Sequence, residues 1–448
     1  MSASHPNRSS EAQERLALAL EGASWSRTRV RLLLGTDAFI DQERRVALMP
    51  RHLEELRRDL DSLGLELEVA VVAGAGARCE PPVRDEDYRA AGAEVVSVTE
   101  AASLPAFDVV HALKEPTDYE ATLAGPFLRL GALHLASKPS GVCRMAKARN
   151  FAAILDGATV GSCAYRLVGH DRTPIVGSMS RFAGSVSGQK VVEALERGGV
   201  EAGTMVVVGG GIAGRSAIRK LGPKTRRLIV VEAWEPTRQH LRTFLPEAGF
   251  EDFEIVESLT DDALVDAVGV VFAHRTGARA AERVCRIEQI RTMRRGAGIA
   301  DIAIDQGGSI AHEGYDETDD AGTAREKYIE LLGEDFAYYA EVNMPREEPT
   351  AASETHGDSS LPYVTALLAL CAQHGDPSAA SEYLLQRPVR AYGSEETLDL
   401  DFLQAIHQDL RNGTQIAVRR REGDAVAVTD PEVARDEPLT RWLMDCAG

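Results

Sequence analysis

Two aspartates interrupt an apolar segment of the chain, GIADIAIDQGG at residues 298–308, and lie four residues apart as Asp301 and Asp305. If this segment is a strand, both side chains point to the same side of it. Because an ionised carboxylate is costly to bury without a partner, the pair requires a helix N-terminus, a cation, a ligand or a reaction. The alternative is structural, with the two acids capping the exit from a strand into a loop.

A glycine-rich segment, MVVVGGGIAGRSAIRKLG, is the second candidate for chemistry. It contains an apolar strand and opens a helix, and its glycines have the G-x-G-x-x-G spacing that lets a backbone approach a pyrophosphate. The charge of the pyrophosphate would lie at the N-terminus of the helix. The alternative is a tight strand-to-helix turn without a ligand. The residues expected to contact the dinucleotide are Gly209, Gly211, Ile212, Ala213 and Gly214.

Glu232 ends the next apolar strand, RLIVVE, about twenty residues after the glycines, as a dinucleotide site requires. Its carboxylate can accept hydrogen bonds from the ribose hydroxyls and would repel a 2′-phosphate. The sequence therefore predicts NAD as the cofactor in preference to NADP. Arg238 lies nearby in the sequence and could weaken this preference.

These residues are set in a regular alternation of short apolar runs and helical patterns. RLLLG predicts a strand, and leucines at helical spacing in residues 52–64 predict a helix that Gly64 ends. A longer helix is expected at about residues 180–198, and helices and a hairpin, QIAVRRREGDAVAV, towards the C-terminus. The acidic stretch 312–334 is expected to be a solvated excursion. The alternation predicts an α/β fold with parallel sheets that carry helices on both faces.

Length and composition limit the classes of protein. The 448 residues are enough for two or three domains, and the formal net charge of -19 argues against nucleic acid and anionic membranes as partners. No apolar run approaches the roughly 20 residues of a membrane span, and residues 1–27 are expected to form a mobile polar tail without a signal-peptide core. The six cysteines are scattered without C-x-x-C, which fits reduced thiols in a cytoplasmic protein and predicts no metal site.

Several short motifs occur in an order that resembles the alanine dehydrogenase family, which is related to the soluble nucleotide-binding part of transhydrogenase and to saccharopine dehydrogenases. The matching pieces are RRVALMP, HALKEP, LGALHLAS, GSMSRFAG, VVVGGGIAG, ADIAIDQGG and EVNMP, followed by LPY. The resemblance implies two Rossmann-like, doubly wound domains with an active-site cleft between them, in a chain that forms homo-oligomers. The first domain is then discontinuous, with a substrate domain of residues 28–168 plus 345–448 around an NAD-binding domain of residues 169–344.

The same resemblance gives roles to single residues. Arg45 and Lys114 would bind the substrate, Arg45 through the substrate carboxylate. His134 and Asp301 would be catalytic, while Asp305 would hold the loop. The alternatives are surface cations for the first two residues and a core histidine for the third. Further cofactor contacts are expected from Ser180 and Asn343.

These residue types suit the oxidation of an amino acid to an imine, which water then attacks. The reaction removes a hydride from the α-carbon and requires an anion clamp, a proton shuttle and a group that orients water. The planar fork of Arg45 fits a carboxylate, and the imidazole of His134 titrates near the operating pH. Asp301 could orient water or stabilise a protonated amine or imine.

Four places depart from the family pattern: the glycine-rich segment before the nucleotide-binding strand is shortened, and the other three each add a cation. Arg166 and Arg181 stand where the family has glutamates, and His274-Arg275 replaces an apolar pair. Arg275 is therefore a candidate for binding the substrate, which is expected to be larger or more anionic than alanine. In the alternative, these cations pair with the protein's own acids.

Three functions are compatible with these motifs. The first is an NAD-dependent amino acid dehydrogenase with a small-molecule substrate. The second is a saccharopine- or opine-type dehydrogenase, which oxidises a secondary amine that carries more than one carboxylate. The third is a non-catalytic NAD-binding protein, and the retention of the four substrate and catalytic residues argues against it.

Overall fold

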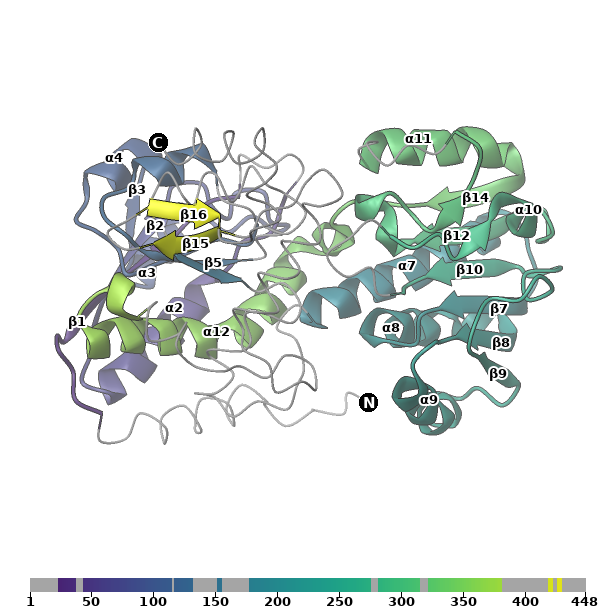
Figure 1. Ribbon diagram of the computed structural model, residues 1–448, viewed down its shortest axis with the longest axis horizontal. Coiled ribbons are helices and arrows are strands. Elements are labelled where there is room, and N and C mark those ends of the chain that lie inside the picture. The colour runs from purple at the N-terminus through teal and green to yellow at the C-terminus, as the bar shows by residue number, and fades with distance from the viewer. Residues whose placement is uncertain are drawn as a thin grey trace. The chain divides into compact units, whose positions relative to one another are not determined.

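A computed structural model of the protein describes residues 23–37, 43–114, 117–131, 151–154, 177–274, 281–314, 321–380, 418–421 and 425–428. The chain divides into two compact units (Figure 1). Unit 1 consists of residues 1–176 and 348–448, and unit 2 of residues 177–347. Each unit is described by itself below.

Unit 1 is built on a six-stranded sheet in the order β3-β2-β1-β4-β5-β6, and all its strand pairs are parallel. The order 3-2-1-4-5-6 is that of a doubly wound Rossmann sheet, which binds ligands beyond the carboxyl ends of its strands. The strands are β1 (Arg29–Leu34), β2 (Glu66–Val72), β3 (Glu94–Val96), β4 (Val109–His111), β5 (Leu128–Gly131) and β6 (Phe151–Ile154).

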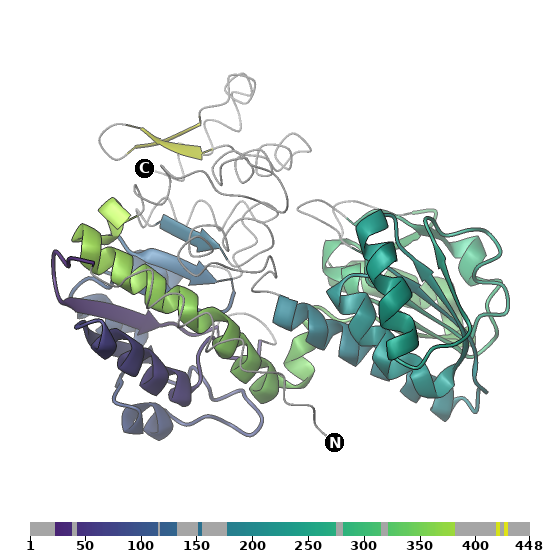
Figure 2. The ribbon, with the colours of Figure 1, turned by 90° about the horizontal axis from the view of Figure 1, so that it is seen from below.

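The helices of unit 1 include one that returns to it from the far end of unit 2 in the sequence. They are α2 (Pro50–Ser62), α3 (Asp85–Ala90), α4 (Val98–Ser103) and α12 (Pro349–His374). Helix α2 confirms the helix predicted from leucine spacing, since Leu53, Leu56 and Leu60 are buried and Gly64 follows it at φ +74°. Figure 2 shows α12 lying alongside α2.

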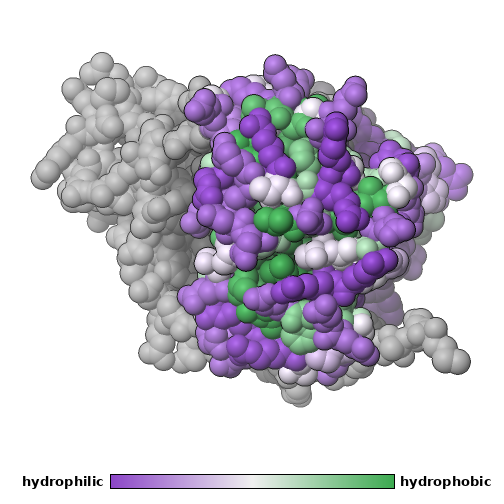
Figure 3. Space-filling model, turned by 90° about the vertical axis from the view of Figure 1, so that its right-hand side faces the viewer, coloured by the Kyte–Doolittle hydropathy of each residue, from purple (hydrophilic) through white to green (hydrophobic). Residues whose placement is uncertain are grey.

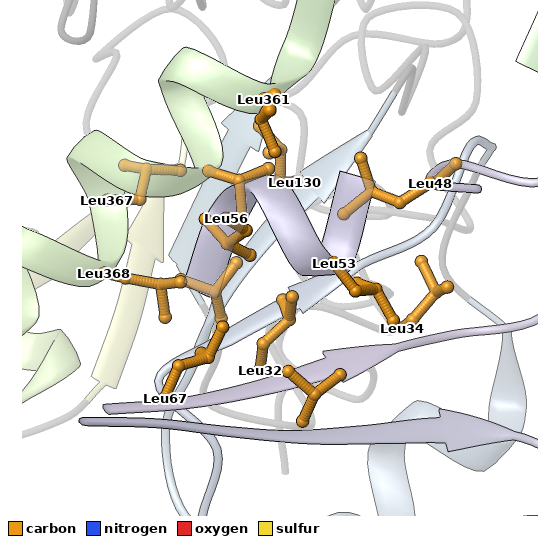
Figure 4. Packing of buried hydrophobic residues seen from close by; sticks show 14 of the residues in the cluster. Leu32, Leu34, Leu48, Leu53, Leu56, Leu67, Leu130, Leu361, Leu367 and Leu368 are labelled. Atoms are coloured by element: carbon orange, nitrogen blue, oxygen red, sulfur yellow. The ribbon is translucent and has the colours of Figure 1, made fainter. Parts of the chain in front are cut away.

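A leucine-rich core joins α12 to the rest of unit 1. The labelled leucines in Figure 4 come from α2, α12, the sheet and, for Leu48, the segment just before α2. They are Leu32, Leu34, Leu48, Leu53, Leu56, Leu67, Leu130, Leu361, Leu367 and Leu368. Burying one leucine side chain contributes about 1.5–3 kcal/mol. This packing therefore makes the late segment 349–374 part of unit 1.

The first described residues are also tied to unit 1. The indole of Trp25 donates a hydrogen bond to the Leu63 carbonyl oxygen at 2.9 Å, and the Ser26 and Arg27 amides donate to the Ala372 carbonyl oxygen. Residues 1–22 of the tail expected at 1–27 lie outside the described residues. These hydrogen bonds place residues 25–27 against the end of α12 and the end of α2.

Unit 2 has a second six-stranded parallel sheet, in the order β14-β12-β10-β7-β8-β9. Numbered from its own first strand, this is again 3-2-1-4-5-6, so both predicted Rossmann-like folds are confirmed. The strands are β7 (Gly203–Val208), β8 (Thr225–Val231), β9 (Phe253–Val256), β10 (Gly269–Phe272), β12 (Ala297–Asp301) and β14 (Phe336–Tyr339). The helices are α7 (Gly177–Arg197), α8 (Ile212–Leu221), α9 (Glu235–Glu247), α10 (Ile287–Ile290) and α11 (Ala321–Leu332).

The acidic stretch 312–334 differs from its expected form. It contains α11, whose Ala324, Tyr328 and Leu332 are buried in the core of unit 2. The Tyr328 hydroxyl donates to the Ile310 carbonyl oxygen at 2.8 Å. The prediction of a solvated excursion was wrong. The buried residues recur every four positions along one face of α11, and the charged residues between them make this apolar face hard to recognise in the sequence.

The remaining described elements are short. Strands β15 (Val418–Arg421) and β16 (Ala425–Val428) form the predicted antiparallel hairpin, while β11 (Cys285–Arg286) pairs with β13 (Ile310–Ala311). The helix expected over LDLDFLQAIHQDLRNG lies outside the described residues. Among the described helices, none is long and apolar enough to cross a membrane. On the face shown in Figure 3, hydrophobic groups are interrupted by hydrophilic side chains.

Candidate functional site

In unit 1, the predicted substrate-binding residues follow neighbouring strands. Arg45 comes after β1 and Lys114 after β4, and these two strands pair in parallel. His134 follows β5, the next strand of the sheet, but lies outside the described residues. Because the carboxyl ends of parallel strands meet at one edge of a sheet, Arg45 and Lys114 belong to the edge where such sheets bind ligands.

Arg45 is held by a buried ion pair with Glu43. Its Nε and Nη2 atoms each donate to one carboxylate oxygen of Glu43 at 2.7 Å, which fixes one edge of the guanidinium. Burial raises the pKa of Glu43, but the charges of Arg45 and Lys114 and the hydrogen bonds from Arg45 outweigh it and lower the pKa below the ordinary value. Arg45 and Lys114 are only 4% and 8% exposed, so neither is a surface cation.

The backbone of Lys114 is fixed by two buried charged side chains. The carboxylate of Asp37 accepts the Leu113 and Lys114 amides at 2.8 and 2.9 Å. From β5, Arg129 donates to the Lys114 carbonyl oxygen at 2.9 Å and to the Glu120 carboxylate at 2.6 Å. Burial and the nearby Glu43 raise the pKa of Asp37 to about 6.

The sequence analysis missed Asp37, Glu43 and Arg129. All three are almost completely buried. Asp37 links the loops after β1 and β4, Glu43 holds Arg45 within the first of these loops, and Arg129 holds Lys114 from β5. One signal was present in the sequence, because Arg129 is a charge inside the apolar run FLRLG. A long cation in a central strand needs a carboxylate partner, which distance in sequence does not reveal.

The glycine loop of unit 2 has the backbone that the fingerprint predicts. Gly209 has φ +99°, and a Cβ there would lie 2.6 Å from the Ala273 carbonyl group at the end of β10. A Cβ at Gly214 would lie 1.8 Å from the Gly209 carbonyl oxygen. At Gly211, by contrast, a Cβ would meet no described atom within 4 Å. The first and third glycines are thus needed for the protein's own packing, whereas the second faces open space at the start of α8.

Glu232 lies at the carboxyl end of β8, beside the glycine loop. Its two carboxylate oxygens accept the Gly210 amide at 2.8 Å and the Trp234 amide at 2.9 Å. Arg238 donates to the backbone carbonyls of Glu232 and Ala233 and pairs with Glu235. The Arg238 guanidinium is therefore held by two backbone carbonyls and by Glu235, which makes it less suited to attract a 2′-phosphate.

Asp301 is completely buried at the end of β12, where the strand gives way to a 3-10 helix, η3 (Ile302–Gln306). One oxygen accepts the Ala303 amide at 3.0 Å and the Ser309 hydroxyl at 2.7 Å, and the other accepts the Ser309 amide at 2.7 Å. Burial raises the pKa of Asp301 to about 6, although these hydrogen bonds oppose the shift.

The expectation that Asp301 and Asp305 share one side of a strand was wrong, because the strand ends at the first acid. Asp301 caps η3 and accepts two hydrogen bonds from Ser309, while the loop-holding role of Asp305 stays a prediction. The backbone of Asp305 belongs to η3, and its side chain lies outside the described part.

The other predicted site residues are distributed over unit 2. Ser180 lies in the first turn of α7, and Asn343 follows β14 with φ +60°, a left-handed conformation that asparagine tolerates. Of the departures from the family pattern, Arg181 is exposed on α7 and His274 is half-buried after β10. Arg166 and Arg275 lie outside the described residues.

Two domain families of known proteins match the chain. The family described as alanine dehydrogenase/PNT, N-terminal domain, matches residues 39–183, and alanine dehydrogenase/PNT, C-terminal domain, matches residues 179–388. The chain belongs to the alanine dehydrogenase/transhydrogenase-like family. Residues 389–448 lie outside both matches.

Two relatives in this family match most of the chain. The alanine dehydrogenase of Staphylococcus saprophyticus is 29% identical over 351 residues, which is 73% of this chain and 85% of the relative. The alanine dehydrogenase of Methanococcus maripaludis is 29% identical over 359 residues, covering 74% of this chain and 86% of the relative.

Two solved structures of family members have the same fold. An L-alanine dehydrogenase superposes with a TM-score of 0.61 at 21% identity and covers 92% of this chain and 100% of its own. A transhydrogenase from Sinorhizobium meliloti superposes with a TM-score of 0.57 at 17% identity and covers 76% of this chain and 95% of its own.

Proposed function

We propose that this alanine dehydrogenase-like protein is an oxidoreductase that uses NAD to oxidise the C–N bond of an amino acid, or to form it in reverse. The observation that carries the proposal is the buried Arg45, whose edge is preset by Glu43 next to Lys114 at the ligand-binding edge of unit 1. The similarity to two alanine dehydrogenases along most of the chain supports the same reaction type.

The residues of unit 2 fit a bound dinucleotide. The open space at Gly211 would admit the pyrophosphate against the N-terminus of α8, and Glu232 lies where the ribose hydroxyls would be recognised. When bound, NAD would supply the acceptor for the hydride of the α-carbon. The carboxylate at Glu232 is the reason to propose NAD and not NADP.

The side chains of unit 1 would bind the amino acid. Arg45 holds the substrate carboxylate as an anion clamp, and Lys114 holds a second oxygen of the substrate. His134 accepts the proton that the amine releases, because an imidazole exchanges protons near neutral pH. Asp301, at the exit of β12, orients water or stabilises the protonated amine or imine.

The roles of these residues are tested by turnover, NAD binding and thermal stability together. His134→Ala should leave NAD binding unchanged and lower kcat by about 10²–10⁴-fold. His240→Ala, on an exposed position of α9, serves as the control and should leave kcat unchanged. Native turnover in the His134 variant would remove that residue from the mechanism.

Comparing Asp301→Asn with Asp305→Asn assigns the acid. If Asp301 acts on the substrate, only its variant loses turnover, and its thermal stability stays native. If Asp301 acts only by holding the loop, its variant loses thermal stability together with turnover.

We propose a substrate larger or more anionic than alanine. The alternative is a saccharopine- or opine-type dehydrogenase, which oxidises a secondary amine that carries more than one carboxylate. Reduction of NAD, followed by near-ultraviolet absorbance, should be measured over small, polar, acidic and N-carboxyalkyl amino acids. Best turnover of alanine itself would contradict the larger substrate, and no turnover of any amine would contradict the proposed function.

A homo-oligomer in the cytoplasm is the expected state of the protein. Light scattering coupled to size-exclusion chromatography gives the mass in solution directly. A mass equal to the chain's 48.4 kDa would contradict the oligomer.

A further inference from the structure

Two buried histidines face each other in unit 1, and the proposed mechanism does not use either of them. His111 is the last residue of β4, and His356 lies on α12, far away in the sequence. Their side chains are 0% and 1% exposed, and their ring centroids are 6.0 Å apart with a tilt of 32° between the planes.

Three of their four ring nitrogens lack a partner among the described residues. His111 Nδ1 lies 3.1 Å from the Leu130 carbonyl oxygen, so this nitrogen carries the proton and Nε2 presents a lone pair. Neither Nε2 of His111 nor either nitrogen of His356 has a hydrogen-bond partner in the described part of the chain.

A third buried histidine in this core has hydrogen-bond partners for both of its ring nitrogens. His52 is also 0% exposed, but its Nδ1 accepts the Met49 amide at 2.9 Å and its Nε2 lies 3.1 Å from the Asp358 carboxylate. A buried polar atom without a partner costs about 1–3 kcal/mol. Three such atoms at one place therefore indicate a group that binds there.

The two rings lie beside the substrate-binding residues. The Val46 amide, next to Arg45, donates to the Ser353 hydroxyl at 2.9 Å, and Ser353 precedes His356 by one turn of α12. His111 precedes Lys114 by three residues. A Cβ at Gly357 would lie 2.1 Å from the His52 ring, so this glycine lets α12 approach α2 closely.

Burial favours the neutral form of both rings. Burial, together with Arg129 and His52, lowers the pKa of His111 to about 3, although the hydrogen bond to the Leu130 carbonyl oxygen opposes the shift. Burial also lowers the pKa of His356 well below its ordinary value, as do the charges of His111, Arg45, His52 and Lys114.

Neutral rings determine what can bind. The lone pair of His111 needs a proton donor, and His356 offers one N–H and one lone pair. A hydroxyl or a carboxamide both donates and accepts, whereas an ionised carboxylate cannot donate. In the described residues, no group of three or more His, Cys, Asp or Glu side chains could hold a metal ion.

We propose that His111 and His356 read the side chain of the amino acid substrate and select an uncharged one that carries a hydroxyl or a carboxamide. This inference rests on the proposed function and names the substrate class for it. The α-carboxylate goes to Arg45, and the side chain of the substrate reaches the histidine pair.

The test compares polar substrates with apolar ones of the same size. For the native protein, kcat/KM for serine should exceed that for 2-aminobutyrate, and kcat/KM for asparagine should exceed that for leucine, by about tenfold or more, since a site built for a hydroxyl or amide rejects analogues that lack it. Aspartate and glutamate should be poor substrates.

Three variants check that the histidines cause this preference. His356→Leu should abolish it, while His356→Gln, which keeps a donor and an acceptor, should retain part of it. His52→Leu perturbs the same core and should leave the ratio unchanged. Thermal unfolding and NAD titration report whether each variant folds, and His111→Leu replaces His356→Leu if the latter does not.

The outcomes separate the inference from the proposed function. If apolar or acidic amino acids are turned over as well as polar ones, or if His356→Leu keeps the native ratio, the nitrogens bind only water and the inference is wrong while the function stands. If no amino acid reduces NAD in a protein that binds NAD, the proposed function fails and the inference fails with it.

Discussion

At the scale of single residues, Glu232 decides the choice of cofactor. Its carboxylate is anchored by the Gly210 and Trp234 amides, and Arg238 is bound to backbone carbonyls. Glu232→Ala should therefore reduce the preference for NAD over NADP by about 1–3 kcal/mol, the worth of a charged hydrogen bond. Quenching of Trp234, which is 60% exposed beside this acid, provides the binding signal.

Glu254→Ala, an exposed acid on the neighbouring strand β9, is the control and should not alter the preference. Equal or tighter binding of NADP by the native protein would contradict the role of Glu232.

Asp301 should make the stability of unit 2 depend on pH. Its pKa is raised to about 6 in the folded protein, above the usual carboxyl value near 4, so the folded state binds the proton more tightly. The stability that Asp301 contributes is therefore present at low pH and falls as pH rises between these two values. The melting temperature of the native protein, relative to Asp301→Asn, should be higher at pH 5 than at about pH 7.5. A difference that does not change with pH would show that burial is not the dominant effect.

At the scale of elements, the glycine loop and α8 form one device in which two glycines have separable tasks. Gly214→Ala should lower the melting temperature, because its Cβ would lie 1.8 Å from the Gly209 carbonyl oxygen. Gly211→Ala should fold normally, since no described atom lies within 4 Å of its Cβ, and should weaken NAD binding by about tenfold or more because the methyl group occupies the approach of the pyrophosphate.

Thermal unfolding and NAD titration of both glycine variants check this division. Native NAD affinity in Gly211→Ala would mean that no pyrophosphate lies against the loop.

Arg129 on β5 forms a buried ion pair with Glu120, which lies between β4 and β5 in the sequence. Arg129→Met should destabilise unit 1 by about 3–5 kcal/mol, because Glu120 would remain buried without its cation. Adding Glu120→Leu should recover part of this loss. Because Arg129 also holds the Lys114 carbonyl oxygen, the double variant should keep a raised KM for the amino acid. Denaturant unfolding gives the first quantity, and a native KM in the double variant would exclude the positioning role.

At the scale of the whole molecule, the two sheets differ in how the chain builds them. Unit 2 is one continuous segment, 177–347, whereas unit 1 needs α12 from beyond it. The fragment 177–347 should therefore fold alone and bind NAD within about tenfold of the full chain, since each unit has its own core. A fragment that ends at residue 347 should retain NAD binding while its unit 1 loses cooperative unfolding. Loss of NAD binding in the isolated fragment would mean that the fingerprint loop depends on unit 1.

The sequence by itself determined the local features of this protein. Each of these features depends on a short stretch of sequence. They are the strand–helix alternation, α2 with its leucine stripe, the hairpin near the C-terminus and the glycine loop. In such short stretches the backbone geometry depends on neighbouring residues. At Gly64, for example, a left-handed glycine ends a helix. The motif order was enough to name the family and, with it, both Rossmann-like folds.

Only the tertiary structure decided which polar groups meet. Glu43 orients Arg45, and the Ser309 hydroxyl donates a hydrogen bond to the Asp301 carboxylate. Helix α12 brings His356 next to His111. The burial of α11 was also decided by the tertiary structure, because its buried positions are recognised only once the helix packs into the core of unit 2. Partners in a folded core are selected by distance in space, and the cost of an unpaired buried charge or ring nitrogen applies only after the chain has closed around it.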